Sequence, residues 1–170
     1  MQDSTTNINV ASDFRQIKFR YDDKDKIFLD ETDYDIFLSI LRKYLLNNDS
    51  VEALAYCLEP DHFCLLLNQL KANGAKDIMQ NILNDYGAYH HKKYMFEKLL
   101  SEGDYEESKI APNDLLDISR DIHLLPEDWK EYPHSSIRAY FYDDTPKWLN
   151  KDYITEQYGS AVQYLEFLES

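Results

Sequence analysis

The chain has few of the residues that mark several common functional classes. Its 170 residues include only four glycines, and these form no glycine-rich phosphate loop. No segment is repeated, and no apolar run approaches the roughly 20 residues that a membrane-spanning helix needs. These absences argue against a P-loop or dinucleotide-binding protein and against any association with a membrane.

Basic residues are also scarce. The 18 lysines and arginines face 32 aspartates and glutamates, so the formal net charge is −14. A nucleic-acid-binding protein has the opposite balance, because its phosphate contacts come from Lys and Arg. On charge alone, the sequence favours a basic protein partner over a nucleic acid.

Cysteine is limited to two residues, and residues 1–13 are polar without the basic-then-apolar pattern of a signal peptide. Both features indicate a reducing, cytoplasmic setting. We expect residues 1–13 to form a flexible tail. The hydrophobic content of 44% and the aromatic content of 14% predict a single packed domain over residues 14–170, with a small helical tail at its C-terminal end.

The hydrophobic periodicity predicts an α+β domain with a mainly antiparallel sheet. The expected strands cover residues 14–21, 27–29, 54–58 and 62–67. The expected helices cover 32–46, 76–93, a segment that opens at Pro112, and a tail over 148–168 that is interrupted at Gly159. Residues 95–110 are expected to form a strand or loop around Gly103, and residues 129–142 an irregular segment.

The most apolar stretch spans residues 56–67. Its Pro60-Asp61 pair predicts a tight turn between two strands. Strand alternation then puts His62 and Cys64 on the same face, two residues apart. They form either a metal-binding pair or two ordinary half-buried residues. The turn also sets Cys57 opposite Cys64, but a reducing cytosol argues against a disulfide between them.

The segment AYCLEPDHFCLLL (55–67) resembles the AYCLMPNHFHLLL motif of the REP-associated tyrosine transposases, single-tyrosine members of the His-hydrophobe-His (HUH) nuclease superfamily. The likeness extends over roughly residues 14–168. It includes, in the order of the family's elements, IFLDETDYDIFLSILRKYL, IMQNILNDYGAYHHKKY, DLLDISRDIHLLP, and YPHSSIRAY followed by PKWL. The resemblance implies a ferredoxin-like HUH fold, with helices packed on a mainly antiparallel sheet.

The resemblance also implies an activity. The family cleaves and rejoins single-stranded DNA beside hairpins, through attack of a tyrosine hydroxyl on a backbone phosphodiester. Its two histidines hold Mg²⁺ or Mn²⁺, which polarises the scissile phosphate. The implied role is in DNA transposition, with single-stranded or hairpin DNA as the partner.

Several positions of this chain depart from the family pattern. The first metal histidine falls on His62, but the second falls on Cys64, whose thiolate suits zinc better than Mg²⁺ or Mn²⁺. The nucleophilic tyrosine falls on Asp121, and an aspartate cannot replace the phenol. The motif's asparagine falls on Leu125, and its Gly-Arg pair falls on Gly103-Asp104. We therefore expect a degenerate member that has lost cleavage activity and holds no metal cofactor.

The remaining basic residues suggest where nucleic acid would bind. His91, Lys92 and Lys93 are clustered, and Lys18, Arg20 and Arg138 complete the candidate set. The alternative for the cluster is a favourable helix C-terminus, where cations complement the helix dipole.

Other side chains allow further chemistry. The tyrosines at 86, 89 and 94 either stack on bases or pack in the core, and Tyr132 or Tyr140 is a candidate for a relocated nucleophile. The aspartates at 114, 117 and 121 form either a metal site or a solvated acidic face. Ser135-Ser136 has no recognisable base partner, which argues against a serine hydrolase.

Two functional hypotheses follow. The first is a transposase-like protein that binds single-stranded or hairpin DNA without cleaving it. The second is a repurposed, non-catalytic protein whose acidic surface binds a basic protein partner. The sequence does not choose between a monomer and a homodimer.

Overall fold

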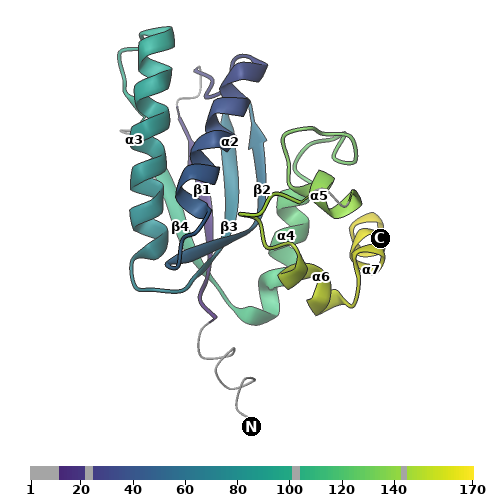
Figure 1. Ribbon diagram of the computed structural model, residues 1–170. Helices are drawn as coiled ribbons and strands as arrows, with labels where there is room; N and C mark the ends of the chain where they lie inside the picture. The colour runs from purple at the N-terminus through teal and green to yellow at the C-terminus, as the bar shows by residue number, and fades with distance from the viewer. Residues whose placement is uncertain (1–11, 22–24, 101–103, 143–144) are drawn as a thin grey trace.

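The computed structural model describes residues 12–21, 25–100, 104–142 and 145–170 (Figure 1). Its first part follows the order strand, helix, strand, strand, helix, strand: β1 (Phe14–Arg20), α2 (Glu31–Leu45), β2 (Val51–Glu59), β3 (His62–Gln69), α3 (Gly74–Tyr94) and β4 (Asp104–Ile110). A 3₁₀ turn, η2 (Pro112–Asp114), then leads into four helices: α4 (Leu115–His123), α5 (Ile137–Phe141), α6 (Asp152–Tyr158) and α7 (Ala161–Glu169).

The four strands form one antiparallel sheet in the order β2-β3-β1-β4. This element order and strand order are those of a ferredoxin-like split βαβ arrangement. The prediction of an α+β fold with an antiparallel sheet is therefore confirmed. None of the described helices combines the length and apolar character needed to cross a bilayer.

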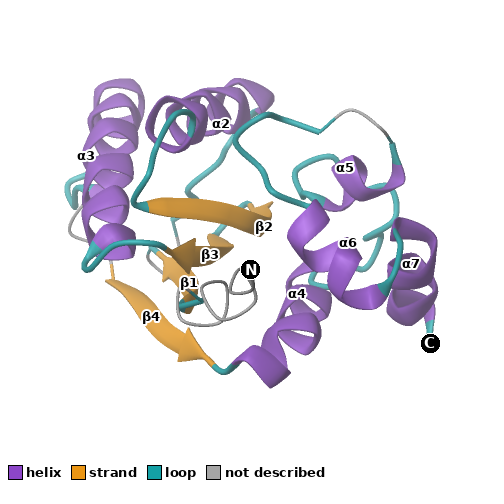
Figure 2. Ribbon diagram, turned by 60° about the horizontal axis from the view of Figure 1, so that its bottom comes forward, coloured by secondary structure: helices purple, strands orange, loops and turns teal. Residues whose placement is uncertain are grey.

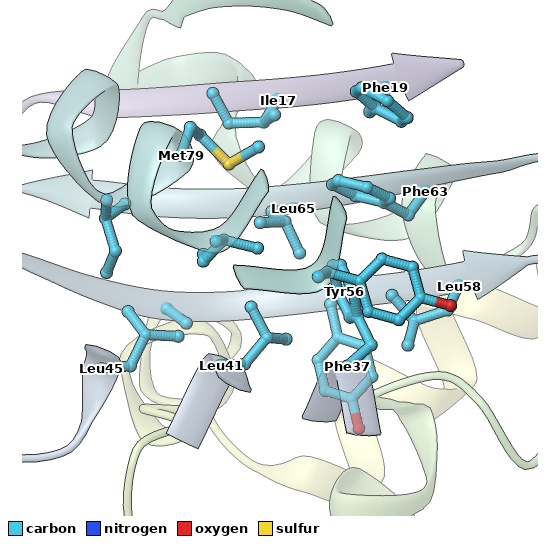
Figure 3. Close-up of a cluster of buried hydrophobic side chains, with 14 of the residues drawn as sticks. Ile17, Phe19, Phe37, Leu41, Leu45, Tyr56, Leu58, Phe63, Leu65 and Met79 are labelled. Atoms are coloured by element: carbon cyan, nitrogen blue, oxygen red, sulfur yellow. The ribbon is translucent and has the colours of Figure 1, made fainter. Parts of the chain in front are cut away.

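Helices α2 and α3 cover one face of the sheet. Period-two alternation sends Phe63, Leu65 and Leu67 of β3 toward these helices, together with Ile17 and Phe19 of β1. Figure 3 labels all of these side chains except Leu67, and it shows them facing Phe37, Leu41 and Leu45 of α2 and Met79 of α3. This layer is the larger of the two hydrophobic cores.

The C-terminal helices gather against the other face, where Cys64 and Leu66 lie (Figure 2). Helix α4 contacts β2 and β3, and its Leu115 and Ile122 are buried there. The β1 positions on this face are covered only in part: Gln16 is buried, but Lys18 and Arg20 are exposed. An open stretch of sheet therefore remains over the end of β1.

Most predicted elements are confirmed within a few residues, including the Pro60-Asp61 turn and the break at Gly159, which has a φ of 109°. The prediction of a strand at residues 27–29 is wrong. That segment is a loop, and the backbone N–H groups of Ile27 and Phe28 both donate to the carbonyl of Pro60. The segment 129–142, predicted to be irregular, contains the short helix α5.

The two described residues before β1 contact the rest of the domain. Residues 1–11 lie outside the described residues, and the hydroxyl of Ser12 lies 3.1 Å from that of Tyr153. The side chain of Asp13 accepts hydrogen bonds from Arg15 and Gln69, and its backbone N–H donates to Asn68. These bonds hold the start of β1 against the end of β3.

Candidate functional site

A groove of about 560 Å³ lies over the open end of β1. Antiparallel pairing creates it by placing Lys18 opposite Cys64 and Arg20 opposite His62, with Glu106 of β4 opposite Lys18 on the other side. Its lining comprises Lys18, Phe19, Arg20, Tyr21, His62, Cys64, Glu106 and Leu125. The structure thus brings together four of the site residues predicted from the sequence: Lys18, Arg20, His62 and Cys64.

The β2–β3 turn holds His62 between two carboxylates. Its Nδ1 lies 2.7 Å from Oδ1 of Asp61, and its Nε2 lies 3.1 Å from Oε1 of Glu59. Arg20 donates from Nη1 to the other oxygen of Asp61 at 3.1 Å. The hydrogen bond with His62 and the nearby positive charge of Arg20 lower the pKa of Asp61. Two of the basic groups in the groove are therefore already paired with acidic groups.

Cys64 is a buried thiol rather than a ligand presented to solvent. Its side chain is 5% exposed, and burial raises the pKa of the thiol to about 11. Cys57 lies directly opposite on β2, as predicted, and burial raises the pKa of that thiol as well. Both cysteines are free. At neutral pH the pair therefore consists of protonated thiols packed in the second core.

The thiol of Cys64 does not suit Mg²⁺ or Mn²⁺, because these ions prefer oxygen ligands and sulfur is a soft ligand. Both ring nitrogens of His62 contact carboxylates, and Cys64 is a protonated sulfur donor. Within the described ranges, no group of three or more His, Cys, Asp and Glu side chains is arranged to hold a metal ion. The residues present thus do not fit the metal that the family resemblance implies.

Asp121, at the predicted position of the nucleophile, is exposed on α4 and is not among the residues that line the groove. Leu125, four residues later, does line it. Asp114 and Asp117 are also exposed. The three aspartates therefore form a solvated face, which was one of the two alternatives.

The other predicted cations lie away from the groove. His91 donates a hydrogen bond from Nδ1 to the carbonyl of Phe96 (3.1 Å), just beyond the end of α3, and Lys92 is exposed nearby. Arg138 lies over the ring of Tyr142 at 5.4 Å. Its helix, α5, sits beside α6 and α7 and away from β1 and β4 (Figure 2). The basic residues therefore do not form one continuous surface.

Lys93 takes part in a network around the buried carboxylate of Asp33. Its Nζ lies 2.9 Å from Asp33 and 2.8 Å from Asp30, and these contacts raise the pKa of Lys93. Tyr89 and Tyr94 donate to the same carboxylate. Burial alone would raise the pKa of Asp33, but the donors around it lower the value to about 2.

The tyrosines predicted as base-stacking or nucleophilic groups are used internally. The hydroxyl of Tyr86 is buried and donates to the carbonyl of Ile27. Those of Tyr132 and Tyr140 donate to carbonyls of β2, at 2.6 and 3.0 Å. Burial raises the pKa of both Tyr132 and Tyr140. Neither hydroxyl is arranged as an activated nucleophile.

Sequence patterns did not predict a buried polar network that is centred on His123. Its Nε2 lies 2.7 Å from Oγ of Ser136, and its Nδ1 lies 2.9 Å from the hydroxyl of Tyr164, which also contacts Ser119. Ser136 in turn bonds to both backbone groups of Tyr56. The serine therefore has a base partner after all, but both residues are at most 1% exposed, so no substrate reaches them.

No protein-family model matches this chain, and no curated protein matches it. A solved structure described as a REP-associated tyrosine transposase bound to a REP hairpin is similar, with a TM-score of 0.58. The likeness covers 77% of this chain and 79% of that chain at 11% sequence identity. At this identity the likeness shows a shared α+β fold. Membership of the family stays a prediction.

Proposed function

We propose that the protein binds single-stranded or hairpin DNA through the groove over β1 and β3, and that it does not cleave the bound strand. The observation that carries this proposal is the convergence of Lys18, Arg20 and His62 in one groove. It is supported by the fold, which is shared with a transposase whose structure holds a hairpin.

The cations of the groove suit weak phosphate binding. Lys18 and Arg20 are exposed and lie two residues apart on the same face of β1, so both reach one side of a bound backbone. Glu106 lies beside Lys18, and Asp61 already holds Arg20. A strand that binds here must compete with these carboxylates. The proposed affinity is therefore low and strongly dependent on salt.

The proposed absence of cleavage rests on the chemistry of the groove residues. Strand transfer in the resembled family needs a tyrosine nucleophile and a divalent metal on two histidines. Here the nucleophile position holds Asp121, an exposed residue outside the groove, and the second histidine position holds the buried thiol of Cys64. Neither group replaces the missing function.

Binding is tested with a labelled DNA hairpin that carries a single-stranded tail. We expect the double substitution K18Q/R20Q to weaken binding about a hundredfold at low salt, since each of the two lost charge-assisted contacts costs about 1.5 kcal/mol. Glu106→Gln should strengthen binding. Lys76→Gln, which removes an exposed charge on α3, and Glu166→Gln, on α7, serve as matched controls.

Cleavage is tested by incubating the same hairpin with the protein and Mn²⁺, followed by denaturing electrophoresis. We expect no covalent protein–DNA adduct. An adduct would refute the non-cleaving part of the proposal, and mapping the linked residue would identify the nucleophile.

A second candidate function is supported by the electrostatics. The net charge of −14 and the acidic partners of His62 and Arg20 favour a basic protein partner over DNA. In that case the hairpin would fail to bind at low salt, and Glu106→Gln would weaken rather than strengthen binding of the basic partner.

A further inference from the structure

Two adjoining hollows lie at the C-terminal end of α2. One, of about 360 Å³, is lined by Ser39, Arg42, Lys43, Leu46 and Asn47. The other, of about 290 Å³, is lined by Arg42, Leu46, Thr145, Pro146, Lys147 and Trp148. Arg42 and Leu46 border both, so the two hollows share one wall. The site is built from segments about 100 residues apart in the chain.

Two of the three cations that line this site have no acidic partner among the described residues. Lys43 pairs with Asp85 at 2.8 Å, but neither Arg42 nor Lys147 forms an ion pair with any described residue. Both are exposed. In a protein with a net charge of −14, two unpaired cations beside the same hollow are available for an external anion.

Thr145 supplies an independent indication. Its Oγ1 is buried and has no hydrogen-bond partner among the described residues. A buried hydroxyl without a partner costs free energy, and such groups in folded proteins usually bond to a water, an ion or a ligand. Thr145 and Lys147 line the same hollow.

We propose that Arg42, Lys147 and Thr145 form a binding site for a phosphate group. A guanidinium presents parallel N–H donors that match phosphate oxygens, an ammonium adds charge, and a hydroxyl adds one more donor. The phosphate belongs either to a small molecule or to a nucleic-acid backbone. The site is separate from the groove over β1, and it does not depend on the function proposed for that groove.

The helix dipole alone does not explain this arrangement. The dipole of α2 favours a cation in its last turn, and this alone explains the presence of Arg42. It does not account for Lys147 and Thr145, which reach the same hollow from the segment before α6.

The test is an NMR titration of the ¹⁵N-labelled full chain with inorganic phosphate at low ionic strength. Saturable shift changes are expected in residues 39–47 and 145–148. Arg42→Gln and Lys147→Gln should each weaken binding about tenfold, whereas Lys109→Gln, which removes an exposed charge on β4, should leave it unchanged.

Two substitutions of Thr145 separate ligand binding from folding. Thr145→Val removes the unpartnered hydroxyl at nearly constant volume, so it should raise the melting temperature and weaken phosphate binding. Thr145→Ser keeps the hydroxyl and should bind as the native chain does. A purely structural threonine would leave phosphate affinity the same in both variants.

The source of the phosphate is identified by adding a short single-stranded oligonucleotide to the phosphate-loaded protein. If the NMR signals of residues 39–47 shift at a lower concentration of oligonucleotide than of free phosphate, the ligand is a nucleic-acid backbone. If these signals shift with free phosphate but not with the oligonucleotide, the ligand is a small molecule. The proposal is overturned if the phosphate-induced shifts are spread over the surface, or if the Arg42→Gln and Lys109→Gln variants bind phosphate with the same affinity.

Discussion

His123, the last residue of α4, is fully buried against the segment around Ser136. Both of its ring nitrogens form hydrogen bonds with hydroxyls, those of Tyr164 and Ser136. A neutral imidazole satisfies both bonds by donating through one nitrogen and accepting through the other. A protonated ring would place an unpaired charge in the second core. Burial accordingly lowers the pKa of His123 from 6.5 to about 3.

This shift predicts a loss of stability in mild acid. The unfolded chain binds a proton at His123 below pH 6.5, but the folded chain does not until about pH 3, so stability falls as the pH drops through this window. The native protein should lose about 2 kcal/mol relative to the His123→Gln variant between pH 7.5 and pH 5. Urea unfolding at both pH values measures this difference. If the unfolding free energies of the two proteins changed equally with pH, the predicted role of His123 would be contradicted.

Single residues also show which parts of the site were predictable. The shared face of His62 and Cys64 follows from strand alternation, which is a local property of the chain. The bond between His123 and Ser136 depends on the path of the chain between α4 and α5, which no local pattern encodes. For the same reason, the sequence could suggest a charge cluster at Lys93 but not its partner Asp33, 60 residues earlier.

At the scale of elements, Asp33 joins α2 to α3. It closes a capping box with Asp30 at the start of α2, and it accepts hydrogen bonds from Lys93 and two tyrosines at the end of α3. The buried carboxylate of Asp33 therefore links the start of α2 to the end of α3.

Replacing Asp33 by Asn should destabilise the fold by about 3 kcal/mol at neutral pH, because the donors around this buried position would lose an ionised acceptor. With a folded pKa of about 2 against 3.8 in the unfolded chain, the stabilisation by Asp33 is complete above pH 3.8. It is lost as the pH falls toward 2. Urea unfolding at pH 6 and pH 2 should therefore show the difference between the two proteins shrinking by about 2 kcal/mol. A constant difference would argue against the ionised carboxylate.

Gly74 fixes the approach of α3 to the sheet. A Cβ atom at this position would lie 2.5 Å from the backbone oxygen of Ser50, which also accepts hydrogen bonds from Leu70 and Lys71. The backbone at this junction has no room for a side chain.

Gly74→Ala should therefore destabilise the protein by about 1–3 kcal/mol, although alanine favours helices by about 1 kcal/mol. Thermal unfolding monitored by circular dichroism measures the change. Unchanged or increased stability would mean that the start of α3 can shift without cost.

At the scale of the whole molecule, the antiparallel α+β architecture was predictable, because alternating and helical apolar patterns recur along most of the chain. Element ends were less certain. The loop at 27–29 has the composition of a strand, but its backbone bonds to a turn rather than to a neighbouring strand. The uneven coverage of the sheet, which opens the groove, depends on how the C-terminal helices pack, and sequence periodicity does not reveal that.

The charge distribution of the whole molecule determines how DNA binding must behave. With a net charge of −14, long-range attraction to DNA is absent, so only local contacts in the groove can contribute. Lys18 and Arg20 are the exposed cations there. Binding should consequently release few counterions.

The most direct test of the groove proposal is the affinity for a tailed hairpin measured across a salt series. For two phosphate contacts, the logarithm of the binding constant should fall with the logarithm of salt concentration with a slope of roughly −1.5. The double substitution K18Q/R20Q should abolish the salt-dependent binding, and Lys76→Gln should leave the slope unchanged. Undetectable binding of the native protein at about 20 mM salt, or identical slopes for the native protein and K18Q/R20Q, would contradict DNA binding through this groove.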